Sequence, residues 1–493
     1  MTALSQATLD HLGASIAVPH YDRSVLLKGI VHIGVGNFHR VHQAVYVDRC
    51  LAAGATEWGI CGVELIDSPA MRDKAQAYKA QDCLYTVTEF APDGTSATRV
   101  VGSMVDYLHA PADPEAVLAR MAHADTRIVS LTITEGGYNI DETSGAFVLA
   151  TPEVAHDLAG GPPRTAFGFI VEALRRRRAA GIGPFTVMSC DNLRHNGDTA
   201  RKAIVSFARA LDADLAAWID AEAAFPNSMV DRIAPQVPPE VRARVNAMNG
   251  IDDALPAISE SFMQWVIEDR FCAGRPAFET VGVELRDDVV AFEFMKGRML
   301  NASHVLLAYP ALLCGQRIVH EALAERRFHD LLDAFLDRDV IPRLEAPRGI
   351  SLTDYKDALL ERFANPAVND QILRLALDGA AKIPVFHSRT IEALLDTGGT
   401  LDREAFLVAC FGRYLLGRDD AGHEFPVNEP HFGEADWQLL KSGDPLALLH
   451  TSLFERLRLF DHADFARLYQ AYAEEIEHNS TSAALDRVLA VKG

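Results

Sequence analysis

The sequence of 493 residues predicts an α/β domain over residues 1–286, followed by an all-α, mostly helical domain over residues 287–493. In the first part, short β-branched runs alternate with helical stretches, which is the order expected of a parallel sheet with crossover helices. From about Val289 onward, helical periodicity dominates and few stretches are typical of strands. The change in periodicity sets the boundary between the two domains.

Four apolar runs are the predicted strands of the first domain: Ile30–Ile33, Trp58–Leu65, Arg127–Thr134 and Phe185–Cys190. Their near-continuous apolar character is typical of strands buried on both faces of a parallel sheet. The helical domain contains five predicted helices: Val289–Leu307, Ala311–Glu325, Phe328–Leu336, Ser351–Phe363 and Phe465–Ile476. The apolar run Met299–Gln316 contains Asn301, His304 and Pro310, so we expect a buried helix there rather than a membrane span.

Composition excludes several classes of function. The net charge of −21 argues against a nucleic-acid partner, which would need a concentrated basic surface. The seven cysteines are scattered and form no CxxC pair, so neither a zinc knuckle nor a disulfide framework is predicted. The N-terminus lacks the pattern of a signal peptide. We therefore expect a cytoplasmic protein with reduced thiols and a small-molecule partner, and oligomeric state is left open.

A glycine-containing turn follows the first predicted strand. Gly34 permits a tight turn, and Gly36 lets the backbone approach a pyrophosphate at the N-terminus of the helix that Asn37 and Phe38 begin. This arrangement predicts a Rossmann-type dinucleotide site, although His39 occupies the place of the usual third glycine. The two glycines alone fit an ordinary strand-to-helix turn as well as they fit a cofactor-binding turn. His39 and His42 have metal-ligand spacing, but no third ligand is evident near them.

The second predicted strand ends in acidic residues. A carboxylate there can bind both hydroxyls of the adenosine ribose and repel a 2′-phosphate, which favours NAD over NADP. Glu64 and Asp67 are the candidates, and Arg72 is the first arginine after them. We prefer Asp67, partly on the family comparison below.

A polar stripe lies on the first apolar helix of the second domain. At 100° per residue from Lys296, His304 falls at about 80°, Asn301 at about 140° and Glu293 at about 60°. Apolar neighbours lower the pKa of a lysine, and a neutral amine is a competent base. Asn301 can donate to an alkoxide oxygen. The alternative is a solvated stripe with a Glu293–Lys296 pair.

A second polar cluster, Ser189–Asn192, follows a predicted buried strand. Ligands of parallel sheets bind beyond the C-terminal strand ends, so Asn192 can offer a second donor to the substrate oxygen. The alternative is that Asp191 and Asn192 serve only as turn or helix-capping residues, for which both types are favoured.

Four segments together resemble the polyol-specific long-chain dehydrogenase family: GVGNFHRVH at 34–42, MSCDNLRHNG at 188–197, NSMVDRI at 227–233 and MKGRMLNASH at 295–304. The Lys–x4–Asn–x2–His pattern in the last segment is specific to that family. The resemblance implies a zinc-independent, NAD-dependent enzyme with no metal site. It implies that Lys296 is the base and that Asn192 and Asn301 are oxyanion donors. It also implies substrate-binding roles for His304, Asp231, Arg374 and Lys382, and a proton path through Glu135 and Glu293.

The expected reaction is reversible oxidation of a secondary hydroxyl of a linear polyol, with D-mannitol to D-fructose first and D-arabinitol and D-sorbitol next. One departure from the family lies at His387-Ser388-Arg389, where members tend to be more apolar. Reduction of fructuronate or tagaturonate is the alternative within the family, because Arg374, Lys382 and Arg389 could serve a carboxylate. Two alternatives from other classes are a non-catalytic NAD sensor, which has no use for a buried lysine, and a zinc alcohol dehydrogenase, which needs cysteine ligands.

Overall fold

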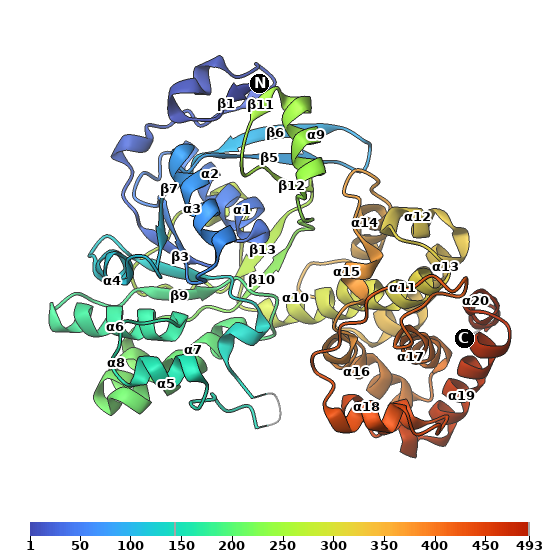
Figure 1. Ribbon diagram of the computed structural model, residues 1–493. Coiled ribbons are helices and arrows are strands. Elements are labelled where there is room, and N and C mark those ends of the chain that lie inside the picture. The colour runs from blue at the N-terminus through green and yellow to red at the C-terminus, as the bar shows by residue number, and fades with distance from the viewer. Residues whose placement is uncertain (142–143, 492–493) are drawn as a thin grey trace. The chain divides into compact units, whose positions relative to one another are not determined.

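The computed structural model describes residues 1–141 and 144–491, with the side chain of Glu135 also outside the described part. The chain forms two compact units, Met1–Val290 and Ala291–Gly493. The first unit is α/β and the second is helical, which confirms the predicted fold class (Figure 1). Among the described residues, no helix has the length and apolar character needed to cross a membrane.

The centre of the first unit is a five-stranded parallel sheet with the strand order β7-β4-β3-β8-β9. Its strands are β3 (Ile30–Ile33), β4 (Ile60–Glu64), β7 (Met104–His109), β8 (Ile128–Leu131) and β9 (Thr186–Ser189). All four predicted strands belong to this sheet. Its helices are α1 (Asn37–Val41), α2 (Gln43–Ala52), α3 (Pro69–Ala80), α4 (Pro114–Ala122), α5 (Pro152–Leu158), α6 (Ala166–Ala179), α7 (Asn196–Leu211) and α8 (Ala213–Glu222).

Three smaller sheets complete the first unit. A four-stranded sheet has the order β12-β5-β6-β2, and its centre is an antiparallel hairpin that the sequence analysis did not predict. The strands of the three sheets are β1 (Thr2–Ala3), β2 (Ile16–Ala17), β5 (Tyr85–Phe90), β6 (Ser96–Val101), β10 (Ser228–Asp231), β11 (Ile251–Asp252), β12 (Ala257–Glu260), β13 (Gln264–Ile267) and β14 (Glu284–Leu285). The helix α9 (Pro239–Asn249) precedes β11.

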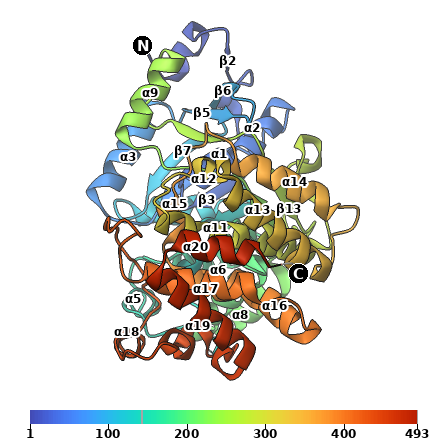
Figure 2. The same cartoon turned by 90° about the vertical axis from the view of Figure 1, so that its right-hand side faces the viewer.

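The second unit is built around the buried helix α11 (Ala302–Leu313). In Figure 2, α19 (Ala463–His478) and α20 (Thr481–Leu489) lie toward the viewer, and both contact α17 (Asp402–Tyr414), which packs on α11. The predicted single helix over 311–325 is wrong. The chain leaves α11 at Leu313, and Gly315 adopts a left-handed φ of +89°, which ends a helix. The remaining helices are α10 (Val289–Lys296), α12 (Val319–Ala324), α13 (Arg326–Ala334), α14 (Leu352–Phe363), α15 (Ile372–Ala376), α16 (Gly379–Thr397), α17 (Asp402–Tyr414), α18 (Glu434–Leu440), α19 (Ala463–His478) and α20 (Thr481–Leu489).

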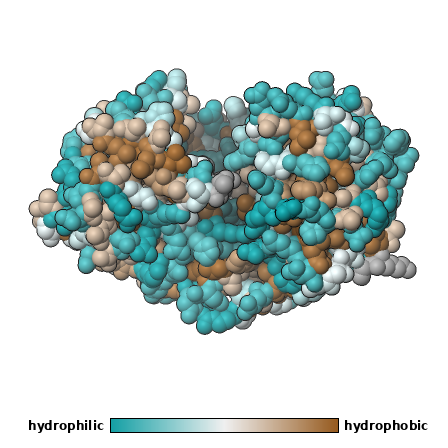
Figure 3. Space-filling model, turned by 90° about the horizontal axis from the view of Figure 1, so that it is seen from below, coloured by the Kyte–Doolittle hydropathy of each residue, from teal (hydrophilic) through white to brown (hydrophobic). Residues whose placement is uncertain are grey.

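The face seen in Figure 3 is largely hydrophilic, with several apolar patches among the polar side chains, the most prominent at the upper left. Large apolar side chains that remain exposed are scattered along the chain, among them Ile66, Met248 and Leu416. Each of the seven cysteines is a free thiol, and of these Cys272 is exposed. Scattered single apolar residues are normal for a globular surface.

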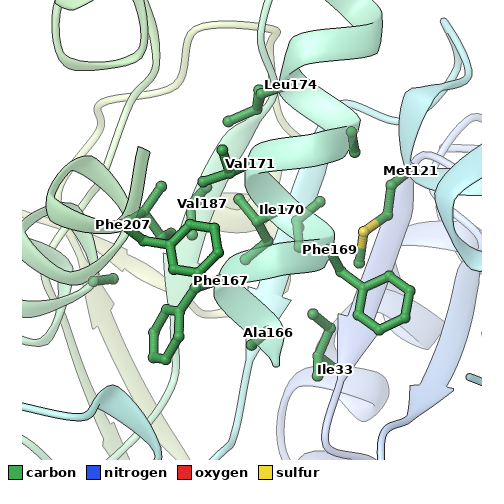
Figure 4. Packing of buried hydrophobic residues seen from close by; sticks show 14 of the residues in the cluster. Ile33, Met121, Ala166, Phe167, Phe169, Ile170, Val171, Leu174, Val187 and Phe207 are labelled. Atoms are coloured by element: carbon green, nitrogen blue, oxygen red, sulfur yellow. The ribbon is translucent and has the colours of Figure 1, made fainter. Parts of the chain in front are cut away.

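The parallel sheet is covered on both faces because its strands are apolar on both faces. Val31 and Ile33 of β3 face the cluster of α4, α6 and α7, while Ile30 faces the cluster of α1 and α2. Figure 4 shows the first cluster, in which Phe169 of α6 lies beside Met121 and Ile33. This packing fixes the C-terminal ends of β3, β4, β8 and β9, where the predicted polar residues begin.

Candidate active site

The turn between β3 and α1 requires glycine at one position and leaves space at the other. Gly34 has a φ of +91°, and a Cβ there would lie 2.1 Å from the carbonyl oxygen of Thr132. At Gly36, the nearest atom to such a Cβ would be the carbonyl oxygen of Gly34 at 3.9 Å. The backbone at Gly36, immediately before α1, is therefore open to close approach by a ligand.

A buried network of neutral side chains supports this turn. The ring of His32 contacts Ser130 Oγ through Nδ1 (2.8 Å) and Thr132 Oγ1 through Nε2 (3.0 Å), and it stacks on His39 at 3.4 Å. His39 in turn bonds Gln43 through Nδ1 at 3.1 Å. Burial lowers the pKa of His32 to about 3 and that of His39 well below 6.5. Both rings are therefore neutral near pH 7, and the side chains that pack under the glycine turn carry no charge.

The two histidines with metal-ligand spacing have other partners. His39 contacts His32 and Gln43, whereas Nε2 of His42 donates to the carbonyl of Gln264 at 2.8 Å. Over residues 1–141 and 144–491, no three His, Cys, Asp or Glu side chains are grouped as metal ligands.

The two acidic candidates after β4 have different environments. Glu64 is buried and accepts hydrogen bonds from the backbone amide two residues on (3.1 Å) and from Lys74 Nζ (3.5 Å). Lys74 also donates to the carbonyl of Val35 in the glycine turn. Asp67 has 62% of its side chain exposed and forms an ion pair with Arg72. Glu64 therefore ties β4 to the turn, and Asp67 is the carboxylate that a ligand can reach.

Asp191 and Asn192 follow β9 and have separate environments. Asp191 is buried and accepts from the backbone amides of Ile133 (3.1 Å) and Thr134 (2.9 Å) and from the hydroxyl of Tyr138 (2.6 Å). It thus holds Thr134 at a φ of +65°, which is strained for a β-branched residue. Asp191 organises the loop after β8, and the exposed Asn192 lies beyond the C-terminal end of β9.

The remaining predicted site residues of the first unit are Asp231 and Glu135. Asn196, which the sequence analysis did not single out, donates to the carbonyl of Ser228 (2.8 Å) and accepts from its amide (2.9 Å), so the segment after β9 is fixed to β10. Asp231 is the buried last residue of β10. Glu135 begins a short 3-10 helix over Glu135–Tyr138, and its side chain lies outside the described part.

The polar stripe of the second unit spans a change of helix type. Glu293 and Lys296 are buried on α10, Gly297–Asn301 form a π-helical turn, and His304 lies on α11. The amide of Ala302 bonds the carbonyl of Gly297, five residues back. Regular α-helical spacing separates Lys296 and Asn301 by about 140°, but a π-helical turn joins residues i and i+5 and brings them closer to one face. The sequence analysis placed these residues on one helix without anticipating this turn.

His304 is a neutral histidine among cations. Its ring stacks on Phe363 at 4.0 Å, and its Nε2 has no hydrogen-bond partner among the described residues. Burial, and then the positive charges of Arg374, Arg362, Lys382 and Lys296, lower the pKa of His304 well below 6.5. A buried polar atom without a partner is costly, so Nε2 is placed to bond a hydroxyl group of a ligand.

Two of the cations around His304 are held by neighbouring groups. Arg374 on α15 forms a bidentate ion pair with Asp370 at 2.6–2.9 Å. Lys382 on α16 donates to the carbonyls of Leu375 (3.1 Å) and Leu377 (2.5 Å). These contacts fix the positions of both side chains beside the stripe.

Comparison with known proteins covers both units. The family model described as mannitol dehydrogenase Rossmann domain matches residues 28–280, and that described as mannitol dehydrogenase C-terminal domain matches residues 288–473. The chain belongs to the mannitol dehydrogenase family. The resemblance to the polyol-specific long-chain dehydrogenases, a family that includes mannitol 2-dehydrogenase, is thereby confirmed.

Three known mannitol dehydrogenase relatives match almost end to end. The polyol:NADP oxidoreductase of Gluconobacter oxydans is 47% identical, over 98% of this chain and 99% of that protein. The crystal structure of a D-sorbitol dehydrogenase in substrate-free form is 46% identical, with a TM-score of 0.90 over 98% of this chain and 100% of that chain. The Pseudomonas fluorescens mannitol 2-dehydrogenase, solved as a ternary complex with NAD and D-mannitol, is 40% identical, with a TM-score of 0.91 and full coverage of both chains.

Sequence reasoning missed three residues of the second-unit site: Arg362, Phe363 and Asp370. A signal existed for Asp370, because Asp and Arg four residues apart form ion pairs when the chain is helical or tightly turned. Nothing in the sequence marks Phe363, which contacts His304 only because α14 packs near α11.

The three buried neutral histidines predict acid sensitivity of the fold. His32, His39 and His304 have folded-state pKa values below that of the unfolded chain, so the unfolded state binds more protons below about pH 6.5. Stability is therefore full above that pH and should decrease as pH falls from 6.5 to 5.5. Urea midpoints at the two pH values test this, with the exposed His20 replaced by glutamine as a neutral control. A midpoint that rises or stays constant on acidification would contradict it.

Proposed function

We propose that this protein oxidises a secondary hydroxyl of a linear polyol to a ketose, reversibly, with NAD as hydride acceptor. D-mannitol to D-fructose is the first candidate reaction, followed by D-arabinitol and D-sorbitol. The observation that carries the proposal is the match of both units to mannitol dehydrogenase domains, with Lys296, Asn301 and His304 on one buried helical segment of the second.

The residues of the first unit fit NAD. Gly36 leaves open backbone before α1, where Asn37 and Phe38 begin the helix, and Asp67 offers an exposed carboxylate for the ribose hydroxyls. When bound, NAD supplies the hydride acceptor. The name of the Gluconobacter relative points to NADP, whereas the exposed carboxylate of Asp67, paired with Arg72, favours NAD in this chain.

Replacing Asp67 with alanine should raise the relative use of NADP. The substitution removes a charge that repels a 2′-phosphate and releases Arg72, which can then bind that phosphate. The ratio of kcat/KM for NAD and NADP measures the effect. The matched control is Asp67→Ala/Arg72→Ala, which should lose the gain in NADP use. Wild-type preference for NADP would contradict the assignment of Asp67.

The side chains divide the chemistry as follows. Neutral Lys296 removes the proton of the reacting hydroxyl, and Asn192 and Asn301 donate to the developing alkoxide. His304 binds a neighbouring hydroxyl through Nε2, and Asp231, Arg374 and Lys382 hold the rest of the polyol. Glu293 and Glu135 pass the proton to solvent. The predicted domain over residues 1–286 is thus the cofactor domain, and the predicted domain over residues 287–493 is the substrate domain.

A panel of polyols with purified protein tests the proposal. D-mannitol, D-arabinitol and D-sorbitol are each supplied with NAD, and NADH formation is followed by absorbance. Turnover of at least one polyol is expected, and full activity after treatment with a chelator is expected of a zinc-independent enzyme. Binding of NADH without turnover of any polyol or ketose would instead indicate a non-catalytic NAD sensor.

A second candidate is reduction of a uronate such as fructuronate or tagaturonate. The observation that favours it is the set of four cations that act on His304, which would also attract a carboxylate. Asp370 neutralises Arg374 in part and so favours a neutral polyol. Comparison of kcat/KM for D-fructose and D-fructuronate, both with NADH, separates the two reactions.

The compartment is also a proposal. We infer a cytoplasmic location because all seven cysteines are free thiols, which persist in a reducing compartment.

A further inference from the structure

A buried histidine and glutamate lie behind the π-helical turn. His387 on α16 and Glu404 on α17 have side chains that are 0% and 1% exposed. Nδ1 of His387 lies 2.9 Å and 3.2 Å from the two carboxylate oxygens of Glu404. Its Nε2 lies 3.1 Å from the carbonyl oxygen of Ala302, the first residue of α11 after Asn301.

The partners fix which way the imidazole points. A carbonyl oxygen only accepts, so Nε2 carries the proton and donates to Ala302. A further proton lies between Nδ1 and Glu404, which holds the ring by its other nitrogen. The ring of Phe335 packs beside it, with centroids 5.7 Å apart. Nε2–H is thereby aimed at one backbone carbonyl of the segment that carries Asn301.

This carbonyl belongs to the residue that closes the π-helical turn. The amide of Ala302 bonds the carbonyl of Gly297, and its carbonyl accepts from His387. π-helical turns are rare and are frequently found at functional sites. A buried histidine–carboxylate pair adds little net stability over apolar side chains of the same volume, so stability alone does not explain the presence of His387 and Glu404.

We propose that His387, oriented by Glu404, is a positioning residue that holds the π-helical turn Gly297–Asn301 in register and so sets Asn301 relative to Lys296. The expected effect on kcat rests on the proposed polyol oxidation. The structural part of the proposal, that His387 stabilises the π-helical turn, does not depend on that function. His387 touches the backbone next to Asn301 and acts on the reaction only through it.

Three variants separate orientation from charge. His387→Leu removes the bond to Ala302 and should lower kcat by about 10-fold or more, with the Kd for NADH unchanged, because a small misplacement of a donor is costly. Glu404→Gln should stay within about threefold of the wild type, since its amide can donate to Nδ1 while Nε2–H stays on Ala302. Glu404→Leu should have a kcat between those of His387→Leu and Glu404→Gln. Asp436→Asn is the control, because this buried carboxylate contacts only Gly433 and Ser452 among the described residues.

Hydrogen exchange provides a readout that needs no substrate. Amides of residues 297–302 should exchange faster in His387→Leu and stay near wild-type rates in Glu404→Gln and Asp436→Asn. If the wild type turns over no polyol while this pattern appears, the proposed function fails and the positioning role stands. The positioning role is overturned if His387→Leu keeps the wild-type kcat and the wild-type exchange rates. It is also overturned if Glu404→Gln lowers kcat as much as His387→Leu does. The third contradicting result is that Asp436→Asn, at the same loss of Tm as His387→Leu, lowers kcat by the same factor.

Discussion

Replacing Lys296 with alanine is expected to lower kcat for polyol oxidation by roughly 10²–10⁴, the usual contribution of a general base. The side chain is buried at the end of α10, within an apolar helix. NADH should still bind, because the glycine turn and Asp67 belong to the first unit. Fluorescence titration of NADH and steady-state kinetics measure the two effects.

The pH dependence distinguishes a base from a structural lysine. Oxidation needs neutral Lys296 and should rise with pH to a plateau, whereas ketose reduction needs the ammonium and should fall as pH rises. Both inflections should disappear in Lys296→Ala, and a small amine added to the buffer should restore part of the oxidation. Lys296→Arg is the control, because a guanidinium stays protonated and should be as inactive as alanine. A Lys296→Ala variant with the full rate and the same profile would transfer the role of base to His304.

The second large effect is expected at the two asparagines. Asn301→Ala and Asn192→Ala should each lower kcat by roughly 10²–10³, the usual loss of one oxyanion donor. The Kd for NADH should hardly change, since the lost bonds are made to the substrate oxygen as charge develops on it. Rapid-mixing measurements of hydride transfer report this step directly.

Matched asparagines control for a loss of folding. Asn246 in the first unit is buried and donates to the carbonyl of Asp253 at 2.9 Å, so Asn246→Ala should cost stability and leave kcat near the wild-type value. Asn301→Asp keeps the size of the side chain but replaces the donor with a negative charge, so it should be worse than alanine. Near-normal turnover in Asn192→Ala or Asn301→Ala would return that residue to a structural role.

Much of the fold could be predicted because its signal is local. Ile30–Ile33 contains three β-branched apolar residues and is bounded by glycine on both sides, and it forms β3 over the same residues. Two predicted strands, Trp58–Leu65 and Arg127–Thr134, are longer than the observed strands β4 and β8. The difference arises because strand pairing ends where the backbone turns into the following loop. The hairpin of β5 and β6 was not predicted, although Pro92, Asp93 and Gly94 form a turn signal between two alternating runs.

The candidate site was predictable only where one segment contains it. Lys296, Asn301 and His304 share a stretch of nine residues, so their spacing is readable from the sequence. The stacking of Phe363 on His304 and the bond from His387 to Ala302 join helices that are distant in the chain. Tertiary packing brings such groups together, and no local pattern encodes it.

The π-helical turn also means that the segment contains one residue more than a regular helix of the same rise would need. Deleting one residue within Gly297–Leu300 would let the backbone bonds run from i to i+4 throughout. Because the deletion removes only the extra residue, Lys296, Asn301 and His304 would keep nearly the same directions around the helix axis. A single deletion therefore removes the wide turn and keeps all three side chains, so it separates the shape of this segment from its chemistry more cleanly than a substitution.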